Sequence, residues 1–145
     1  MWKLSPDQRL EKWKKFRNSL DDLTLEEALQ QNADFWSSCP WVPFYLDEQN
    51  PNDWPDPWTL ISENYYCELA KCLGMLYTVY LTKHTIDPAI ECYKHHTGDL
   101  YILVVNEKYV LNMKSGEVVN RQYITKDYKL KFALNADKLR IHTYV

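Results

Sequence analysis

Three residues in the middle of the chain have the types and the order that thiol chemistry requires. Cys67 comes first, His96 follows and Asn112 comes third. In a thiol hydrolase a histidine accepts the proton of the cysteine, and a further polar residue orients the imidazole ring. The order of these residues therefore indicates a nucleophile, a base and an orienting group, if the fold brings them together.

The four cysteines differ in what we expect of them. Their positions, Cys39, Cys67, Cys72 and Cys92, form no C-x2-C pair, and neither a metal site nor a cofactor is indicated. On a helix that begins near Asp56, Cys72 falls on the apolar stripe and Cys67 lies nearly opposite. We expect Cys72 in the core, and Cys67 either packed in a second face or exposed near a cleft.

Two capping boxes predict that the chain begins with a helical hairpin over residues 1–38. The sequence "SPDQ" at residues 5–8 starts a helix of residues 6–20, and "TLEE" at residues 24–27 starts a second one. In both segments apolar residues recur at helical spacing. These two helices are the first element that the remainder of the chain must pack against.

A Trp/Pro-rich segment follows at residues 39–57 and holds five of the seven prolines. Proline fixes its own backbone and disfavours helix before it, so this segment is expected to be extended. Exposed aromatic patches commonly mark contact surfaces. We therefore predict that the segment crosses the domain surface and binds a protein partner through Trp41, Phe44, Tyr45 and Trp54.

Residues 58–145 are predicted to form one central helix packed on an antiparallel sheet. Pro57 starts the helix, and Gly74 is expected to end it before a strand of residues 75–84. Six further segments read as strands separated by turn residues: "AIECYKH", "DLYILVVN", "KYVLNMK", "EVVNRQYIT", "KLKFALN" and "LRIHTYV". The sequence thus predicts an α+β fold, a single domain of residues 1–145, and a sheet of about five to six strands.

Residues 56–113 resemble the papain-like and transglutaminase-like superfamily, in which a cysteine helix precedes an antiparallel sheet that carries the other two residues. The resemblance implies a thiol hydrolase or acyltransferase that uses Cys67, His96 and Asn112. The chain departs from the family pattern in three places, one of which is that its closing acid is matched only by Asn112. The family cysteine begins its helix, whereas Cys67 is predicted about three turns inside one. The family strand opens His-x-aromatic, whereas this strand reads Asp99-Leu100-Tyr101.

A second resemblance covers the whole chain. The tryptophan- and arginine-containing first helix, "YLDEQNPNDWPDPWTLI" and "YYCELAKCLGMLYTVYL" together look like small uncharacterised proteins of tailed, marine-type phages. This resemblance implies a virus-encoded protein in the host cytoplasm or the virion. The N-terminus lacks the apolar run of a secretory signal, which agrees with a cytoplasmic protein whose thiols are reduced.

Charge is distributed unevenly although the net charge is only −3. Residues 1–20 carry a net charge of +4, residues 21–100 carry −11, and residues 101–145 carry +4. Such polarisation favours a protein partner or self-association, and no membrane partner is indicated. The three glycines lie far apart, which excludes a phosphate-binding loop and a dinucleotide fingerprint.

We interpret these features as a non-enzymatic structural or interaction module that binds a protein partner. The first alternative is a thiol hydrolase or acyltransferase with Cys67 as nucleophile and His96 as base. The second is nucleic-acid binding by the basic C-terminal sheet, whose cationic and aromatic residues include Lys129, Lys131, Arg140, Tyr123 and Tyr128.

Overall fold

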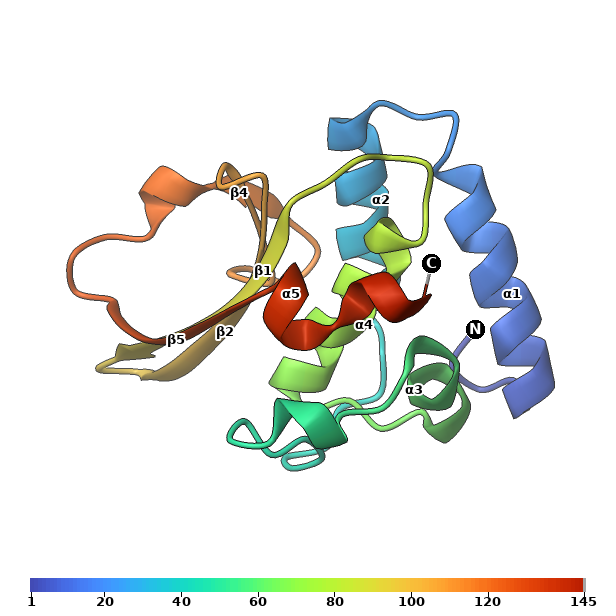
Figure 1. The fold of residues 1–145 in the computed structure, drawn as a ribbon, viewed down its shortest axis with the longest axis horizontal. Coiled ribbons are helices and arrows are strands. Elements are labelled where there is room, and N and C mark those ends of the chain that lie inside the picture. The colour runs from blue at the N-terminus through green and yellow to red at the C-terminus, as the bar shows by residue number, and fades with distance from the viewer. Residues whose placement is uncertain (145) are drawn as a thin grey trace.

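The N-terminal part of the chain is helical, as its capping boxes predict. The computed structural model describes residues 1–144. Helix α1 spans Pro6–Ser19 and helix α2 spans Leu25–Trp36, and both capping boxes are formed. The rings of Phe16 and Phe35 stack with centroids 4.0 Å apart and join the two helices. The N-terminus lies on the helical side of the molecule, away from the sheet (Figure 1).

The predicted central helix is in fact two helices. Helix α3 spans Pro57–Glu63 and helix α4 spans Glu68–Tyr80. Asn64 ends α3 in the left-handed conformation, with a φ of 62°, which asparagine tolerates better than most residues. The break places Cys67 at the very start of α4. Our prediction that Cys67 lies three turns inside a helix is therefore wrong.

Helix α4 does not end at Gly74, so the strand predicted for residues 75–84 is also wrong. The helix continues to Tyr80, and Gly74 lies in its middle against the indole of Trp36. A Cβ atom at residue 74 would lie 2.6 Å from Trp36 Cζ2, closer than real Cβ contacts. Glycine is required here by packing, and not because a helix ends.

The sheet is antiparallel and has five strands among the described residues, which confirms the predicted α+β class. The strand order is β4-β3-β2-β1-β5. The strands are β1 Pro88–His95, β2 Gly98–Val105, β3 Tyr109–Leu111, β4 Val118–Asn120 and β5 Lys129–Asn135. The segment after β5 is helical, with α5 at Ala136–Leu139 and a 3-10 turn at Ile141–Tyr144, so the last predicted strand is wrong. Val145, its final residue, lies outside the described residues.

Alternation along the strands gives the sheet two different faces. One face packs on α4 and contributes Ile90, Leu103 and Leu111 to the main core. The opposite face carries a second, smaller cluster that includes Tyr93 and Ile102. In Figure 1 the helices lie on one side of the sheet, so a side chain must point to that side to reach α4.

No helix formed by residues 1–144 is long and apolar enough to span a membrane.

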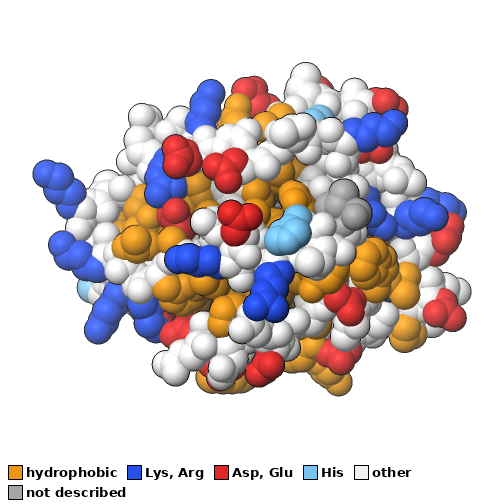
Figure 2. Space-filling view, viewed as in Figure 1, with side chains coloured by type: hydrophobic (Ala, Val, Ile, Leu, Met, Phe, Trp, Pro, Cys, Tyr) orange, Lys and Arg blue, Asp and Glu red, His pale blue; other side chains and the backbone are white. Residues whose placement is uncertain are grey.

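On the face shown in Figure 2, several lysine and arginine side chains gather at the left, over the sheet. The basic residues proposed for nucleic-acid binding are not all free, because Lys131 pairs with Glu48 at 2.7 Å and with Asp99 at 3.1 Å. Tyr128 stacks on His95 with ring centroids 4.2 Å apart.

Candidate active site

Cys67 is the N-cap residue of α4. Its Sγ accepts a hydrogen bond from the Ala70 N–H at 3.5 Å, and its carbonyl accepts one from Lys71 at 2.9 Å. The residue is 8% exposed and lines a cleft. Because the N-terminus of a helix carries partial positive charge, it favours an anion placed there. The position of Cys67 at a helix start is thus the one that the resembled superfamily gives its cysteine.

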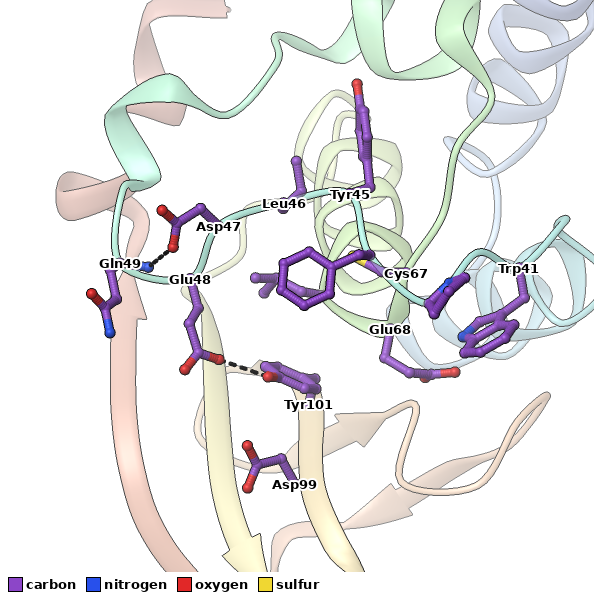
Figure 3. A pocket seen from close by; sticks show the side chains of 13 residues that line it. Trp41, Tyr45, Leu46, Asp47, Glu48, Gln49, Cys67, Glu68, Asp99 and Tyr101 are labelled. Carbon is purple, nitrogen blue, oxygen red and sulfur yellow. Dashed lines mark hydrogen bonds between the residues drawn. The ribbon is translucent and has the colours of Figure 1, made fainter.

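The cleft over Cys67 has a volume of about 410 Å³. One wall is the first half of the Trp/Pro-rich segment, from Trp41 to Gln49, and the facing wall is formed by β2 (Figure 3). The Val42 N–H donates to the Tyr66 carbonyl at 3.0 Å, which holds the segment beside the start of α4. The Trp/Pro-rich segment therefore builds the site around Cys67.

The four aromatic residues predicted to bind a partner take different positions. Trp41 is 63% exposed and Phe44 is 85% exposed, and both line the cleft. Tyr45 also lines it, and its hydroxyl donates to the Glu63 carboxylate. Trp54 is buried and its indole donates to the Asp47 carbonyl at 2.7 Å, so its ring holds the segment and offers no surface to a partner.

Tyr101 lies on the β2 wall of the cleft (Figure 3). Its hydroxyl donates to the Glu48 carboxylate at 2.6 Å. Burial and the hydrogen bond to Glu48 raise the pKa of Tyr101 far above its usual value. Lys131 pairs with both Glu48 and Asp99, which neutralises part of the negative charge there. The phenol of Tyr101 is thus a neutral hydrogen-bond donor and not a base.

Asn112 lies beside the first turns of α4. It follows β3 with a φ of 73°. Its Nδ2 lies 2.9 Å from the Glu68 carboxylate, 3.0 Å from the Tyr101 carbonyl and 3.5 Å from Cys72 Sγ. Asn112 therefore orients the carboxylate that follows Cys67, and no imidazole.

His96 does not reach the cleft. It lies in the turn after β1, and His95 Cβ shares the sheet face of Tyr93, opposite α4. Cys92 pairs with Tyr101 in the β1–β2 register, so the end of β1 lies about 10 Å further along the strand at about 3.3 Å per residue. No histidine among residues 1–144 lines the cleft. The structure places Asn112 beside Glu68 and Cys72, with no recorded contact to Cys67, and leaves His96 apart.

The other three thiols belong to the protein interior or are partly covered. Cys72 is fully buried, as predicted, and burial raises its pKa. Burial also raises the pKa of Cys39 to about 11 and that of Cys92 to about 11. At neutral pH these thiols are protonated and unreactive.

The neighbouring histidines His95 and His96 lie close together. Strand β1 ends at His95, and the ring centroids of the two residues are 4.0 Å apart. Alternation stops where the strand stops, so both rings lie on one side of the turn. Their surroundings form a cluster separate from the cleft.

Solved structures whose fold resembles that of this chain include LapG of Legionella pneumophila. Calcium-bound LapG matches with a TM-score of 0.74 and 14% identity over 92% of this chain and 78% of LapG. EGTA-treated LapG matches with a TM-score of 0.72 and 13% identity, over 90% and 74%. The sequence matches no protein-family model and no curated protein sequence.

These likenesses correct our main functional interpretation. The likeness to LapG contradicts the non-enzymatic interaction module and favours the thiol alternative. The architectural resemblance of residues 56–113 is confirmed at the level of the fold. None of the LapG structures is a phage protein, so the phage resemblance gains no support from them.

Calcium, which LapG binds in one of these structures, does not fit the potential metal-ligand clusters of this chain. Calcium takes about six to eight oxygen ligands. Glu48 and Asp99 provide carboxylates with Cys92, but the ammonium of Lys131 lies 2.7 Å and 3.1 Å from them. The other cluster has a single carboxylate, Asp127. We therefore assign no step to calcium.

Sequence reasoning missed Tyr101, Glu68 and Glu48 as residues of the site. Strand spacing could have identified Tyr101. Asp99 and Tyr101 are two residues apart on a strand, so their side chains must lie on the same face of the sheet. The position of Glu48 depends on how the Trp/Pro-rich segment folds back over β2. No local pattern in the sequence determines that path.

Proposed function

We propose that the protein is a cysteine-dependent acyl-transfer enzyme, a thiol hydrolase or acyltransferase of transglutaminase-like type, with Cys67 as its nucleophile. The observation that carries the proposal is the position of the Cys67 sulfur, at the N-terminus of α4 and on the wall of a cleft. The LapG-like fold supports it, because a cysteine protease shares that architecture.

In the proposed reaction the Cys67 sulfur attacks the carbonyl carbon of an acyl donor bound in the cleft. The thiol proton passes to water or to a carboxylate, of which Glu68 is adjacent in sequence and is held by Asn112 at 2.9 Å. Collapse of the tetrahedral adduct breaks the bond to the leaving group and leaves a thioester on Cys67. Water or an amine then takes the acyl group and regenerates the thiol.

The described residues of the cleft include no imidazole, and this restricts which leaving groups the proposed reaction can expel. An amide nitrogen must be protonated as it leaves, which protonated histidine achieves in cysteine proteases. Asp47, Glu48, Glu68 and Asp99 are the carboxyl groups lining the cleft, and carboxylates are poor proton donors at neutral pH. Esters and thioesters leave without this proton. We therefore propose these as acyl donors in preference to amides.

The acyl donor is expected to contact the exposed rings on the outer wall. Trp41 and Phe44 offer apolar surface beside Cys67. Burial of an aromatic or aliphatic acyl group against these rings removes apolar surface from water. A hydrophobic acyl chain is thus the best match for this wall.

The test is acylation by p-nitrophenyl esters, followed by mass spectrometry of the intact protein and its peptides. We expect one ester-derived acyl group on Cys67, released on addition of hydroxylamine. The variant Cys67→Ala should lose the adduct, whereas Cys39→Ala should keep it. The matching p-nitroanilide should react at least about 100-fold more slowly, because it lacks an acid catalyst.

Two results would overturn the proposal. One is acyl transfer that is equally fast in the Cys67→Ala variant, which would place the chemistry elsewhere. The other is complete inertness of Cys67 toward activated esters in the folded protein. Fast hydrolysis of the anilide with Cys67 required would keep the nucleophile but refute the preference for esters.

A further inference from the structure

The turn after β1 and the loop before β5 bring three potential metal ligands together outside the cleft. His95, His96 and Asp127 each offer one ligand atom, and these atoms lie within 4.8 Å of one another. His95 Nε2 lies 2.8 Å from Asp127 Oδ2. Asp127 is separated from His95 by 32 positions in the sequence, so the fold itself brings the carboxylate to the two adjacent histidines.

Neighbouring side chains hold two of the three ligands in place. The ring of His95 stacks on Tyr128 with an interplanar angle of 13° and centroids 4.2 Å apart. Asp127 accepts a hydrogen bond from the hydroxyl of Thr125. Because both side chains are restrained before any ion arrives, little conformational entropy would be lost on binding.

We propose that His95, His96 and Asp127 bind a divalent transition-metal ion, with zinc as the best match. Two imidazoles and a carboxylate form a ligand set that suits zinc, nickel or copper, whereas calcium requires more oxygens. Three protein ligands would leave a fourth tetrahedral position for water. This inference does not depend on the function proposed for Cys67, because the cluster lies outside the cleft.

The distances around His95 fit metal binding at its Nε2. With zinc bonds of about 2.0–2.2 Å, two ligands of a tetrahedron lie about 3.3 Å apart. His95 Nε2 and Asp127 Oδ2 must separate from 2.8 Å by roughly half an ångström to reach that geometry. His96 is exposed in a turn, so its ring can rotate toward the ion.

The second nitrogen of His95 has the partner that a metal-bound imidazole requires. Its Nδ1 lies 2.8 Å from the Thr97 hydroxyl oxygen and, with no ion bound, also accepts a longer hydrogen bond from the Thr97 N–H at 3.4 Å. If the ion takes Nε2, the ring proton sits on Nδ1 and is donated to this oxygen, which fixes the tautomer and the ring orientation. Thr97 would thus be a positioning residue for the ion.

A comparison within the same structure shows why this cluster and not the other is proposed. In the cluster of Glu48, Cys92 and Asp99, the ammonium of Lys131 already pairs with both carboxylates. Among residues 1–144 no lysine or arginine pairs with Asp127, whose ion pair is with His95. The position between the carboxylate and the two imidazoles is therefore open to an external cation.

The experiment is a titration of the full chain with zinc chloride in competition with a chromogenic zinc indicator. We expect one ion per chain and at least about tenfold weaker binding in each of His96→Ala and Asp127→Asn. The controls His142→Ala, at an exposed histidine elsewhere, and Cys67→Ser should bind zinc as the unmodified protein does. Cobalt bound in place of zinc should show no thiolate charge-transfer band.

A second readout does not depend on the variants. In NMR spectra of the unmodified protein, zinc should shift the imidazole signals of His95 and His96 and leave those of His84 and His142 unchanged. Equal shifts in all four histidines, no saturable binding, or binding that is lost only in Cys67→Ser would each overturn the proposal.

Discussion

At the scale of single residues, Cys67 and Tyr101 determine what chemistry the cleft can support. The sequence identifies Cys67 as the thiol to follow and Cys72 as a core residue, and the burial of Cys72 confirms the second. It does not identify the group that faces Cys67. His96 has the right type and order, but strand alternation and the length of β1 place it away from α4.

Replacing Tyr101 by histidine should make Cys67 more reactive. Tyr101 lies on the cleft wall and is hydrogen-bonded to Glu48, so an imidazole at this position would have a carboxylate to orient it. A positioned base contributes about 100-fold or more in such reactions, and we expect at least about a tenfold faster reaction of Cys67 with iodoacetamide at neutral pH.

The control for this substitution is Tyr101→Phe. Phenylalanine removes the hydroxyl and its bond to Glu48 but supplies no base. Stopped-flow measurement of thiol alkylation should separate the two variants. If Tyr101→His reacts no faster than Tyr101→Phe, then Tyr101 does not lie where a base could serve Cys67.

At the scale of the elements, the break between α3 and α4 creates the site. The two N-terminal helices are predictable because each begins with a capping box that the structure forms. The break is not predictable from periodicity, because Ile61, Tyr65 and Leu69 continue one stripe straight across Asn64. A left-handed asparagine interrupts the backbone there although the apolar spacing continues.

Gly74→Ala should destabilise the protein by about 1–3 kcal/mol, because the added methyl group would overlap the Trp36 indole and force α2 and α4 apart. Urea unfolding monitored by circular dichroism measures this free energy. Helix propensity acts in the opposite direction, since alanine favours a helix by about 1 kcal/mol over glycine. A destabilised variant would therefore show that packing outweighs propensity.

The matched test is the same substitution in a Trp36→Leu background. The smaller side chain leaves room for the methyl group, so Gly74→Ala should cost less there, or stabilise the protein. An equal cost in both backgrounds would refute the packing explanation for Gly74.

At the scale of the whole molecule, one hydroxyl group links three helices. Thr78 Oγ1 in α4 accepts hydrogen bonds from the indole N–H groups of Trp13 in α1 and Trp36 in α2, each at 3.0 Å. The hydroxyl itself donates to the Gly74 carbonyl at 2.7 Å. All of these side chains are buried. The hairpin helices are thus fastened to α4, whose N-terminus carries Cys67.

Thr78→Val should lower the free energy of unfolding by about 2–5 kcal/mol. Valine keeps the shape but leaves two buried indole donors without an acceptor, at about 1–3 kcal/mol each. Thr78→Ser, which keeps the oxygen, should cost less than about 2 kcal/mol. Equal stability of the valine and serine variants in urea unfolding would show that these hydrogen bonds contribute little.

The fold class follows from the sequence more readily than the site does. Strand alternation and turn residues between 88 and 135 predict an antiparallel sheet. Strands β3, β4 and β5 fall within predicted segments, and β1 and β2 each begin one residue before theirs. The cleft depends on the path of residues 41–49 beside Tyr66 and β2, which contacts between distant segments determine. Contacts of this kind do not depend on the spacing of residues along the chain, so local periodicity cannot predict them.

The most direct test of Cys67 as a nucleophile is the rate at which iodoacetamide alkylates each of the four cysteines, followed by peptide mass spectrometry. Cys39 and Cys92 have pKa values raised to about 11 and Cys72 is fully buried, so all three should label slowly at neutral pH and faster only as pH rises. Cys67 should label at least about tenfold faster at neutral pH. Labelling of Cys67 as slow as that of Cys72 would contradict a nucleophilic role.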